Sequence, residues 1–235
     1  MCGRLTLTSN KKEKLTDLLP DATASDWHGN RYNITPGQLI PVIKSLATPR
    51  VEWLRWGLIP AWADDPSIAW KLINARSETV AEKPAFRHAF TTRRCLVLAN
   101  GYYEWQAGPG KSSPKIPYYF HFPGRELFAI AGLWESWTSP EGEGIETCTL
   151  ITKAANAWVA EIHHRMPALL DPAMIPAWLD PSTSTDALHR LFRSAPHPRL
   201  QRYPVSPRVN RASEDDEGLI EPNDDGLPGE QMTLF

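Results

Sequence analysis

The sequence is poor in cysteine, in long apolar runs and in net charge. Its three cysteines, Cys2, Cys95 and Cys148, are too few and too scattered for a disulfide framework or a structural zinc site. No run approaches the 18 apolar residues of a membrane helix, and no apolar segment follows a basic start, so neither a membrane span nor a signal peptide is predicted. We therefore expect a soluble cytoplasmic protein.

Proline and tryptophan, in contrast, are abundant. The 22 prolines among 235 residues predict many turns and short elements rather than long helices. The ten tryptophans must either fill the core or form a stacking surface, and Trp53, Trp56, Trp134 and Trp178 are expected in the core. With 42% hydrophobic and 22% charged residues, the chain can form a packed core and is not expected to be disordered as a whole.

The net charge of −2 conceals an uneven distribution of charge along the chain. Residues 213–235 contain eight acidic residues and no lysine or arginine, which leaves 19 acidic against 25 basic residues in 1–212, a net charge of +6. A mildly basic body is compatible with a nucleic-acid partner but does not require one. We expect a folded domain over 1–212 followed by a mobile acidic tail over 213–235.

Local patterns predict short strands interrupted by short helices. Because strands and helices do not alternate regularly, the chain is expected to form a strand-rich α+β domain. The expected helices are 10–20, 154–163, 171–179 and 186–192; the expected strands are a hairpin over 39–58 with its turn at 47–50, an apolar stretch over 95–105 with an Asn-Gly turn signal, and 117–122, 127–137 and 147–152.

The chain opens with Met-Cys-Gly-Arg. If Met1 is removed, Cys2 carries an α-amine and a thiol on adjacent carbons. The amine titrates near pH 8, so part of it is neutral at pH 7 and can form a Schiff base with an aldehyde. The thiol can then close on the imine carbon to give a five-membered thiazolidine ring. The alternative from this tetrapeptide alone is that Cys2 is an incidental small residue.

Two known kinds of protein use an N-terminal Cys-Gly. In N-terminal-nucleophile glutamine amidotransferases the cysteine attacks an amide carbonyl, and here Asn100–Gly101 would supply the oxyanion hole. This chain, however, has Arg4 where those enzymes have isoleucine, and it has no recognisable substrate-binding arginine block. The amidotransferase therefore remains the second hypothesis.

Six ordered blocks of sequence favour the other family. The blocks, in chain order, are Cys-Gly-Arg at 2–4, Arg-Tyr-Asn-Ile-Thr-Pro-Gly at 31–37, Arg-Trp-Gly-Leu-Ile-Pro-Ala-Trp at 55–62, Ile-Asn-Ala-Arg-Ser-Glu-Thr at 73–79, Gly-Tyr-Tyr-Glu-Trp at 101–105 and Ile-His-His-Arg-Met-Pro at 162–167. With these blocks the chain resembles, over roughly 1–210, the SRAP family, the SOS-response-associated peptidases or abasic-site processing proteins, which implies the SRAP fold.

Proton transfer is the chemistry that this resemblance calls for. An abasic sugar must open from its hemiacetal to the aldehyde, so a carboxylate and an imidazole are expected beside the Cys2 amine. Glu104 lies between aromatic residues, where burial would raise its pKa; the alternative is a solvated strand carboxylate. For the imidazole, the residues alone do not decide between His163 and His164, and the resemblance favours His163.

The resemblance also implies contacts to DNA. Asn74 and Arg76 are two residues apart, as on one face of a strand, and the resemblance places Asn74 against the sugar and the Cys2 amine. It makes Arg4, Arg76 and Arg165 candidates for binding phosphates through their guanidinium groups, the alternative for each being a surface ion pair. Trp62 and Trp105 could stack on bases. No metal cluster or nucleotide loop is recognisable, so no cofactor is expected.

The last five residues form a second pattern. Gln231, Met232, Thr233, Leu234 and Phe235 resemble the pentapeptide that binds the bacterial sliding clamp, in which glutamine fixes the register and two apolar side chains enter a groove. The alternative is that Leu234 and Phe235 fold back on the core. Clamp binding would deliver the protein to replicating DNA in the nucleoid of a bacterium or in a phage replisome.

Together these patterns predict a DNA-damage protein. The resemblance implies that Cys2 is freed from Met1 by self-processing, the peptidase activity of the family, and forms a covalent thiazolidine link to abasic sites in single-stranded DNA. Abasic-site lyase activity is an expected side reaction. A single-turnover protein needs no second subunit, so a monomer is expected. Besides the amidotransferase, the alternative is a DNA-damage adaptor that binds single strands and the clamp without bond chemistry.

Overall fold

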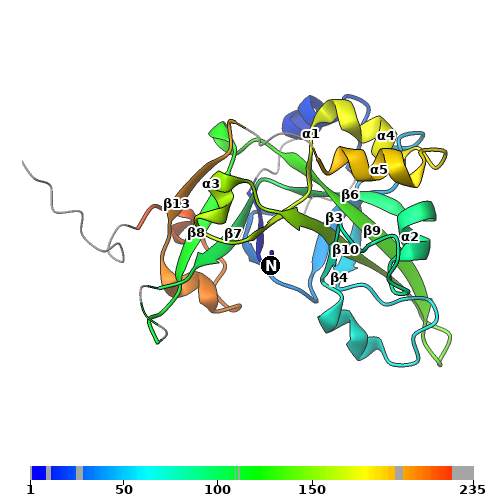
Figure 1. Ribbon diagram of the computed structural model, residues 1–235, viewed down its shortest axis with the longest axis horizontal. Helices are drawn as coiled ribbons and strands as arrows, with labels where there is room; N and C mark the ends of the chain where they lie inside the picture. Colours follow the sequence, from blue (N-terminus) through cyan, green and yellow to red (C-terminus); the bar gives the residue numbers. More distant parts are fainter. Residues whose placement is uncertain are drawn as a thin grey trace, which may run out of the picture.

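Two β-sheets form the framework of the chain (Figure 1). The computed structural model describes residues 2–8, 12–24, 29–108, 110, 112–193 and 198–223. The first sheet has five strands, in the spatial order β13 (Gln201–Pro204), β8 (Ile116–His121), β7 (Gly101–Gln106), β1 (Leu5–Leu7) and β2 (Arg31–Ile34). Each neighbouring pair in this sheet is antiparallel.

The second sheet has eight strands and closes on itself. Its order is β11 (Arg165–Pro167), β10 (Gly144–Ala154), β4 (Glu52–Trp56), β3 (Leu39–Ile43), β6 (Arg94–Ala99), β9 (Phe128–Thr138) and β12 (Leu169–Leu170), with β5 (Asn74–Arg76) also paired to β10. Because β9 pairs with β10 as well as with β6, the strands β10, β4, β3, β6 and β9 form a closed barrel. Closure removes the unpaired edges that an open sheet would leave.

Short helices and 3₁₀ turns connect the strands along the chain. The α-helices are α1 (Lys12–Leu18), α2 (Arg87–Thr92), α3 (Ala157–Ala160), α4 (Ile175–Leu179) and α5 (Thr185–Leu191); the 3₁₀ turns are η1 (Pro66–Lys71), η2 (Pro123–Arg125), η3 (Pro172–Met174), η4 (Pro207–Asn210) and η5 (Glu217–Ile220). All five 3₁₀ turns but the last begin with proline, which fits a first turn because its missing N–H has no partner there. No helix in the described part of the chain is long and apolar enough to cross a membrane.

The predicted strand-rich α+β fold is confirmed, including the hairpin of β3 and β4. The helix expected over 154–163 is a single turn, α3, which begins where the Asn156 side chain accepts from the N–H of Val159. The Asn-Gly pair does not turn a hairpin: β6 and β7 lie in different sheets, and the chain crosses between them at Asn100. Asn100 is fully buried, and its Oδ1 accepts from the hydroxyl of Thr6 at 2.9 Å.

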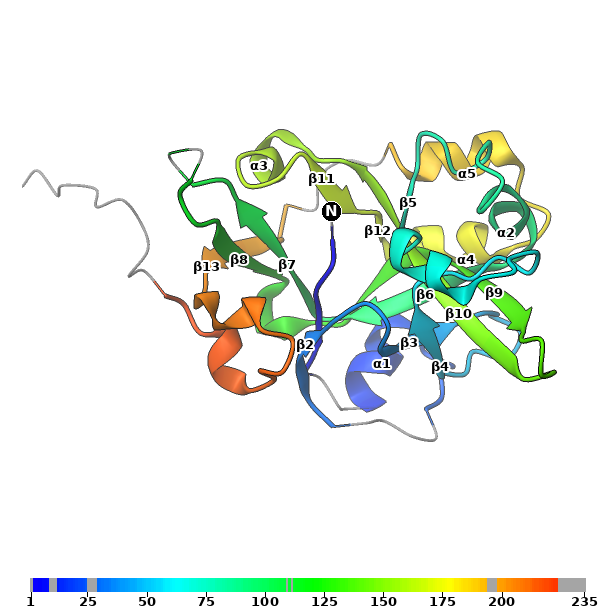
Figure 2. The same cartoon turned by 90° about the horizontal axis from the view of Figure 1, so that it is seen from below.

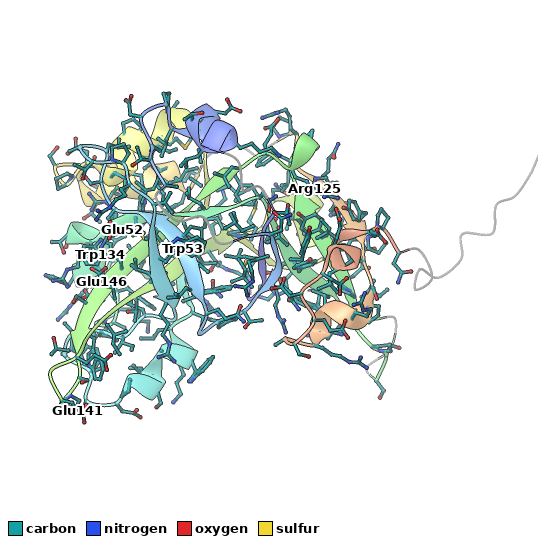
Figure 3. The ribbon with its side chains drawn as sticks, turned by 180° about the vertical axis from the view of Figure 1, so that it is seen from behind. Glu52, Trp53, Arg125, Trp134, Glu141 and Glu146 are labelled. Atoms are coloured by element: carbon teal, nitrogen blue, oxygen red, sulfur yellow. The ribbon has the colours of Figure 1, made fainter. Side chains whose placement is uncertain are left out.

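Two of the four tryptophans expected in the core, Trp56 and Trp178, are fully buried. Trp53 and Trp134 are only half-buried, because they lie on the outer surface of the barrel. Figure 3 shows Trp134 beside Glu52 and Glu146 on this surface. The Lys44 ammonium bonds both carboxylates, at 2.7 and 2.9 Å, and lies 4.4 Å from the centre of the Trp134 ring. This polar cover explains why the Trp134 ring is not in the core.

Residues 213–223, the first half of the tail expected to be mobile, pack against the first sheet. Asp215 accepts from the backbone N–H groups of Tyr32 and Asn33 on β2, at 2.5 and 3.0 Å. Leu219 and Ile220 in η5 are fully buried against the first sheet. The mobile tail was predicted from the number of acidic residues. In the structure, carboxylates of this segment accept hydrogen bonds from backbone N–H groups, and two apolar residues hold the segment against the sheet. Residues 224–235, with the proposed clamp residues Gln231, Met232, Leu234 and Phe235, lie outside the described residues.

Candidate active site

Cys2 lies where the two sheets meet. The N-terminal segment leads into β1, and Figure 2 shows the chain terminus beside β11 of the second sheet. The N–H of Tyr103 on β7 donates to the carbonyl of Arg4 at 3.1 Å, and the Nδ2 of Asn74 on β5 donates to the carbonyl of Cys2 at 2.7 Å. Cys2 is fully buried. The first residues are thus held by strands from both sheets.

The thiol of Cys2 is neutral in this position. Burial raises the pKa of the Cys2 thiol, and the negative charge of Glu104 raises it further. An unassisted thiolate therefore does not form near pH 7. In the printed sequence the nitrogen of Cys2 is in a peptide bond with Met1, so a nucleophilic amine exists only after that bond is hydrolysed.

Glu104 and His163 face each other beside Cys2. Glu104 is the fourth residue of β7 and only 1% exposed, and burial raises its pKa from 4.5 to about 7. The Nδ1 of His163 lies 3.7 Å from Oε2 of Glu104. A carboxyl group with a pKa near 7 can give or take a proton at neutral pH, which is the property predicted for this residue.

His163 has partners for both states of its Nδ1. This nitrogen lies 3.1 Å from the N–H and 3.1 Å from the carbonyl oxygen of Arg165, so it can accept from one or donate to the other. Burial lowers the pKa of His163, and the neighbouring His164 ring, 4.4 Å away between centroids, lowers it further. The imidazole is therefore neutral at pH 7. His164 is exposed, so the structure brings His163 and not His164 to Glu104.

Two buried polar atoms near Cys2 have no hydrogen-bond partner among the described residues: the Oδ1 of Asn74 and the hydroxyl of Tyr102. Tyr102 lies two residues before Glu104 on β7, so the two side chains share a face. Burial raises the pKa of Tyr102, and the negative charge of Glu104 adds to this effect. Unsatisfied buried polar atoms are rare, and two at one place indicate a site built for another molecule. Tyr102 was not predicted as a site residue. Its position two residues before Glu104 could have indicated it, because alternate residues of a strand share a face.

The three arginines proposed to bind phosphates differ in exposure. Arg76 is exposed at the end of β5. Arg4 donates to Oδ1 of Asn33 at 2.8 Å, which ties the N-terminal segment to β2. Arg165 is 8% exposed and makes a bidentate ion pair with Glu78, at 2.6 and 3.0 Å. Arg4 and Arg165 thus have protein partners that the sequence did not predict, and a phosphate at Arg165 would have to compete with Glu78. Phosphate binding by the three stays a prediction.

The comparisons with known proteins decide the family. Residues 1–212 match the family described as SOS response associated peptidase (SRAP). The chain belongs to this family. It is 38% identical over 228 residues to the abasic site processing protein YoqW of Bacillus subtilis (strain 168), which covers 94% of this chain and 99% of that protein. The resemblance inferred from six sequence blocks is therefore confirmed.

More distant SRAP relatives and a solved structure agree. The abasic site processing protein HMCES of Xenopus tropicalis is 34% identical over 222 residues, covering 80% of this chain and 64% of that protein. A crystal structure of a protein from Bacteroides thetaiotaomicron superposes with a TM-score of 0.84 at 26% identity, covering 94% of this chain and all of the other. The SRAP fold is thus shown for both sheets.

In this SRAP protein the two tryptophans proposed for stacking differ. Trp62 is 61% exposed in the segment before η1. Trp105 is half-buried, and its Nε1 donates to Oδ1 of Asn210 at 2.8 Å. Its ring lines a groove of about 840 Å³ together with Lys115 and Pro207. Within the described ranges, no group of three or more His, Cys, Asp or Glu side chains could hold a metal ion.

Proposed function

We propose that this SRAP protein processes abasic sites in single-stranded DNA by forming a covalent thiazolidine link through Cys2 after Met1 is removed. The observation that carries the proposal is the position of Cys2, buried beside the facing Glu104 and His163 and bonded to Asn74. The names of the relatives, abasic site processing proteins, support the substrate class.

The first step is hydrolysis of the bond between Met1 and Cys2. One water is consumed and methionine leaves, so the nitrogen of Cys2 becomes an α-amine. We assign this step to the protein itself, with the Glu104–His163 pair as the proton-transfer groups. Intact mass spectrometry of the purified protein tests it: Glu104→Gln should retain Met1 to a greater extent than the wild type. Equal processing of the two proteins would assign the step to another enzyme.

The sugar is the next reactant. The hemiacetal opens as its hydroxyl loses a proton and the ring oxygen gains one, which exposes the C1′ aldehyde. The Cys2 amine adds to C1′, and loss of water leaves a Schiff base. His163, neutral near pH 7, accepts the protons that leave, and protonated Glu104 donates to the departing hydroxyl.

Ring closure uses the thiol. Its sulfur bonds C1′ while its proton passes to the nitrogen, so the five-membered ring forms without loss of a further group. A thiol kept neutral by burial delivers its own proton in this step. Without closure, the Schiff base favours elimination of the 3′ phosphate, which is the lyase side reaction.

One gel experiment tests the proposal. Wild type, Cys2→Ala and Cys2→Ser are incubated with a single-stranded oligonucleotide that contains one abasic site, and Cys148→Ala serves as a control because Cys148 is equally buried but lies in the barrel. We expect heat-stable adducts for the wild type and the control and none for Cys2→Ala or Cys2→Ser, because both variants keep the α-amine, lack the sulfur, and so give strand cleavage through the Schiff base instead. Adducts formed by Cys2→Ala would contradict the proposal.

The gel together with a glutamine-hydrolysis assay separates the two alternatives. Retention of the oligonucleotide without a covalent bond would indicate a DNA-damage adaptor. Hydrolysis of glutamine, measured as ammonia release, would indicate an amidotransferase that uses Cys2 as a nucleophile. The fixed stoichiometry of one adduct per chain, expected of a single-turnover monomer, can be read from the same gel.

A partner of the C-terminus is proposed from sequence alone. The pentapeptide 231–235 fits the sliding-clamp motif, with Leu234 and Phe235 as apolar anchors and Gln231 and Met232 before them. Clamp binding would bring the protein to replicating DNA, where abasic sites occur in single strands. Deletion of 231–235 should abolish retention on immobilised clamp and leave crosslinking unchanged. Retention of the deletion variant would refute this partner.

A further inference from the structure

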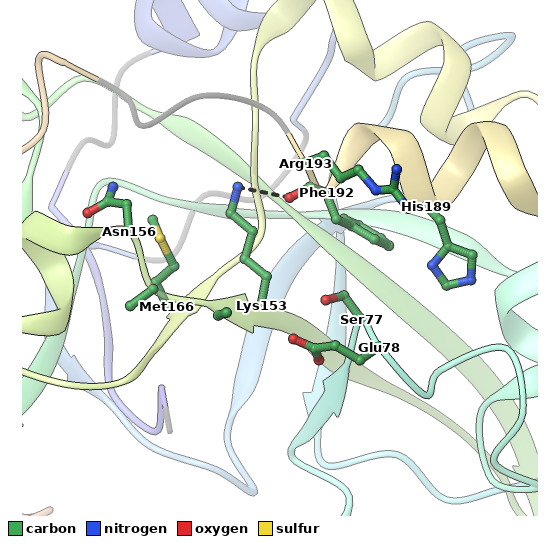
Figure 4. Close-up of a pocket in the computed structure, with 10 residues that line it drawn as sticks. Ser77, Glu78, Lys153, Asn156, Met166, His189, Phe192 and Arg193 are labelled. Carbon is green, nitrogen blue, oxygen red and sulfur yellow. Dashed lines mark hydrogen bonds between the residues drawn. The ribbon is translucent and has the colours of Figure 1, made fainter.

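A pocket of about 490 Å³ lies outside the candidate active site, and Figure 4 shows the side chains that line it. It is formed by β10, β11, α5 and the residues that follow β5. Figure 2 shows α3, β11, α5 and the chain terminus along the same side of the molecule. Glu78 joins the two places, because it lines the pocket and also binds Arg165, two residues after His163.

The lining of the pocket contains more cationic than acidic side chains. Lys153 on β10 extends into it and is 9% exposed, with its ammonium 3.2 Å from the carbonyl oxygen of Phe192. Arg193 and His189 stand on the opposite wall. Glu78 is the one acidic side chain among the described residues that line the pocket, and Arg165 neutralises its charge. Lysine and arginine facing a shared space form a typical site for an anion.

The burial of Lys153 has an energetic consequence. Burial lowers the pKa of Lys153, which means that the ammonium loses hydration in the folded protein. In the folded protein the bond to the carbonyl oxygen of Phe192 and the negative charge of Asp171 offset part of this loss. Neutral donors are also present: the Oδ1 of Asn156 already caps α3 by accepting from Val159, so its Nδ2 is the atom left to donate to a ligand. Asn156 and Lys153 flank the same opening in Figure 4.

We propose that this pocket binds a backbone phosphate of the DNA strand that flanks the abasic nucleotide, with Lys153 and Arg193 as its main contacts. The inference rests on the proposed function, because it takes the strand to pass from Cys2 across β11. A phosphate fits better than a base, since the lining offers cations and amide donors and its aromatic ring, Phe192, is 8% exposed. A single strand fits better than a free nucleotide because the pocket adjoins the site where the lesion would react.

The test separates strand binding from bond chemistry. Non-covalent affinity is measured by fluorescence anisotropy for oligonucleotides that contain a tetrahydrofuran abasic analogue, which lacks the aldehyde and cannot crosslink. The strand is lengthened one nucleotide at a time, first on one side of the lesion and then on the other. Variants are Lys153→Met, which keeps the length of the side chain, and Arg193→Gln, which changes an exposed residue. Arg190→Gln is the control, because Arg190 lies in α5, three residues before Arg193, but does not line the pocket.

Both variants are expected to bind long strands several-fold more weakly than the wild type and to bind the shortest strands equally well. The penalty should begin at one length on one side of the lesion. The slope of log K against log salt should also fall by about 0.7 for each lost phosphate contact. Equal affinity and equal slope for Arg193→Gln and the wild type at every strand length would overturn the proposal. A loss of affinity that is as large for the shortest strands as for the longest would also overturn it.

Failure of the proposed function would look different. If the wild type forms no adduct with aldehyde-bearing abasic DNA while Arg193→Gln still weakens binding to long strands, the phosphate site stands and the covalent chemistry fails. If adducts form and Arg193→Gln has no effect on affinity, the phosphate site fails and the covalent chemistry stands. Thermal unfolding of Lys153→Met establishes whether that variant is folded, and Arg193→Gln decides the question if it is not.

Discussion

The ionisation of Glu104 should destabilise the fold, and the effect can be measured without DNA. Burial raises the pKa of Glu104 from its ordinary 4.5 to about 7. The folded chain therefore holds this proton more tightly than the unfolded chain. As a result, the free energy of unfolding falls as pH rises from about 4.5 to about 7, and above pH 7 the full penalty is present.

The size of the penalty follows from the shift. Each pKa unit corresponds to about 1.4 kcal/mol, so a shift of this size is worth about 3 kcal/mol. Glu104→Gln removes the ionisation and keeps the volume and the hydrogen-bonding atoms. Relative to the wild type, the variant should become more stable by about 3 kcal/mol between pH 5 and pH 8.5. The titration of His163 is present in both proteins and largely cancels in the difference.

The assay is urea unfolding of both proteins at several pH values across this range. Glu82→Gln is the matched control, since it makes the same substitution at an exposed position. A difference between Glu104→Gln and the wild type that stays constant with pH would refute the argument. It would mean that Glu104 is ionised throughout and cannot act as an acid near pH 7.

Three further predictions concern packing and can be checked by thermal or urea unfolding. Gly101→Ala places a Cβ within 2.3–2.4 Å of the Tyr119 side chain and should lower the free energy of unfolding by about 1–3 kcal/mol. Gly144→Ala, with no atom within 4 Å of the added Cβ, should leave it nearly unchanged, and equal effects of the two variants would contradict this packing. Tyr102→Phe removes a buried hydroxyl without a partner and should be neutral or stabilising, while Tyr119→Phe loses a bonded hydroxyl and should cost about 1 kcal/mol. Asp215→Ala should lower stability by about 1–3 kcal/mol because two N–H groups of β2 lose their acceptor; unchanged stability would show that 213–223 contributes little.

Local sequence predicted the elements but not how they close. The alternation around 39–58 suffices for the β3–β4 hairpin, because turn and strands are neighbours in the chain. The barrel depends on pairing of β9 with β6 on one side and β10 on the other, which no local pattern encodes. For the same reason the Asn-Gly pair predicted a turn at Asn100. In the structure the chain crosses between the two sheets at this residue, and its side chain bonds Thr6 of β1, more than 90 residues earlier.

The site was predictable where the chemistry needs a particular residue type. Glu104 and His163 were expected because an aldehyde reaction needs an acid and a base, and the structure brings them together. Tyr102 and Lys153 were missed because an aromatic and a lysine in strands are ordinary, and only burial and a shared cavity set them apart. The partner of Arg165 was likewise invisible, since Glu78 lies 87 residues away in the chain.

The central claim, that both the nitrogen and the sulfur of Cys2 join the sugar, is tested most directly by tandem mass spectrometry of the crosslinked peptide after nuclease digestion. The account predicts a peptide that begins at Cys2, carries the abasic sugar with loss of one water, and resists both thiol alkylation and amine acylation at that residue. A crosslinked peptide that retains Met1, or one in which the Cys2 thiol can still be alkylated, would contradict it.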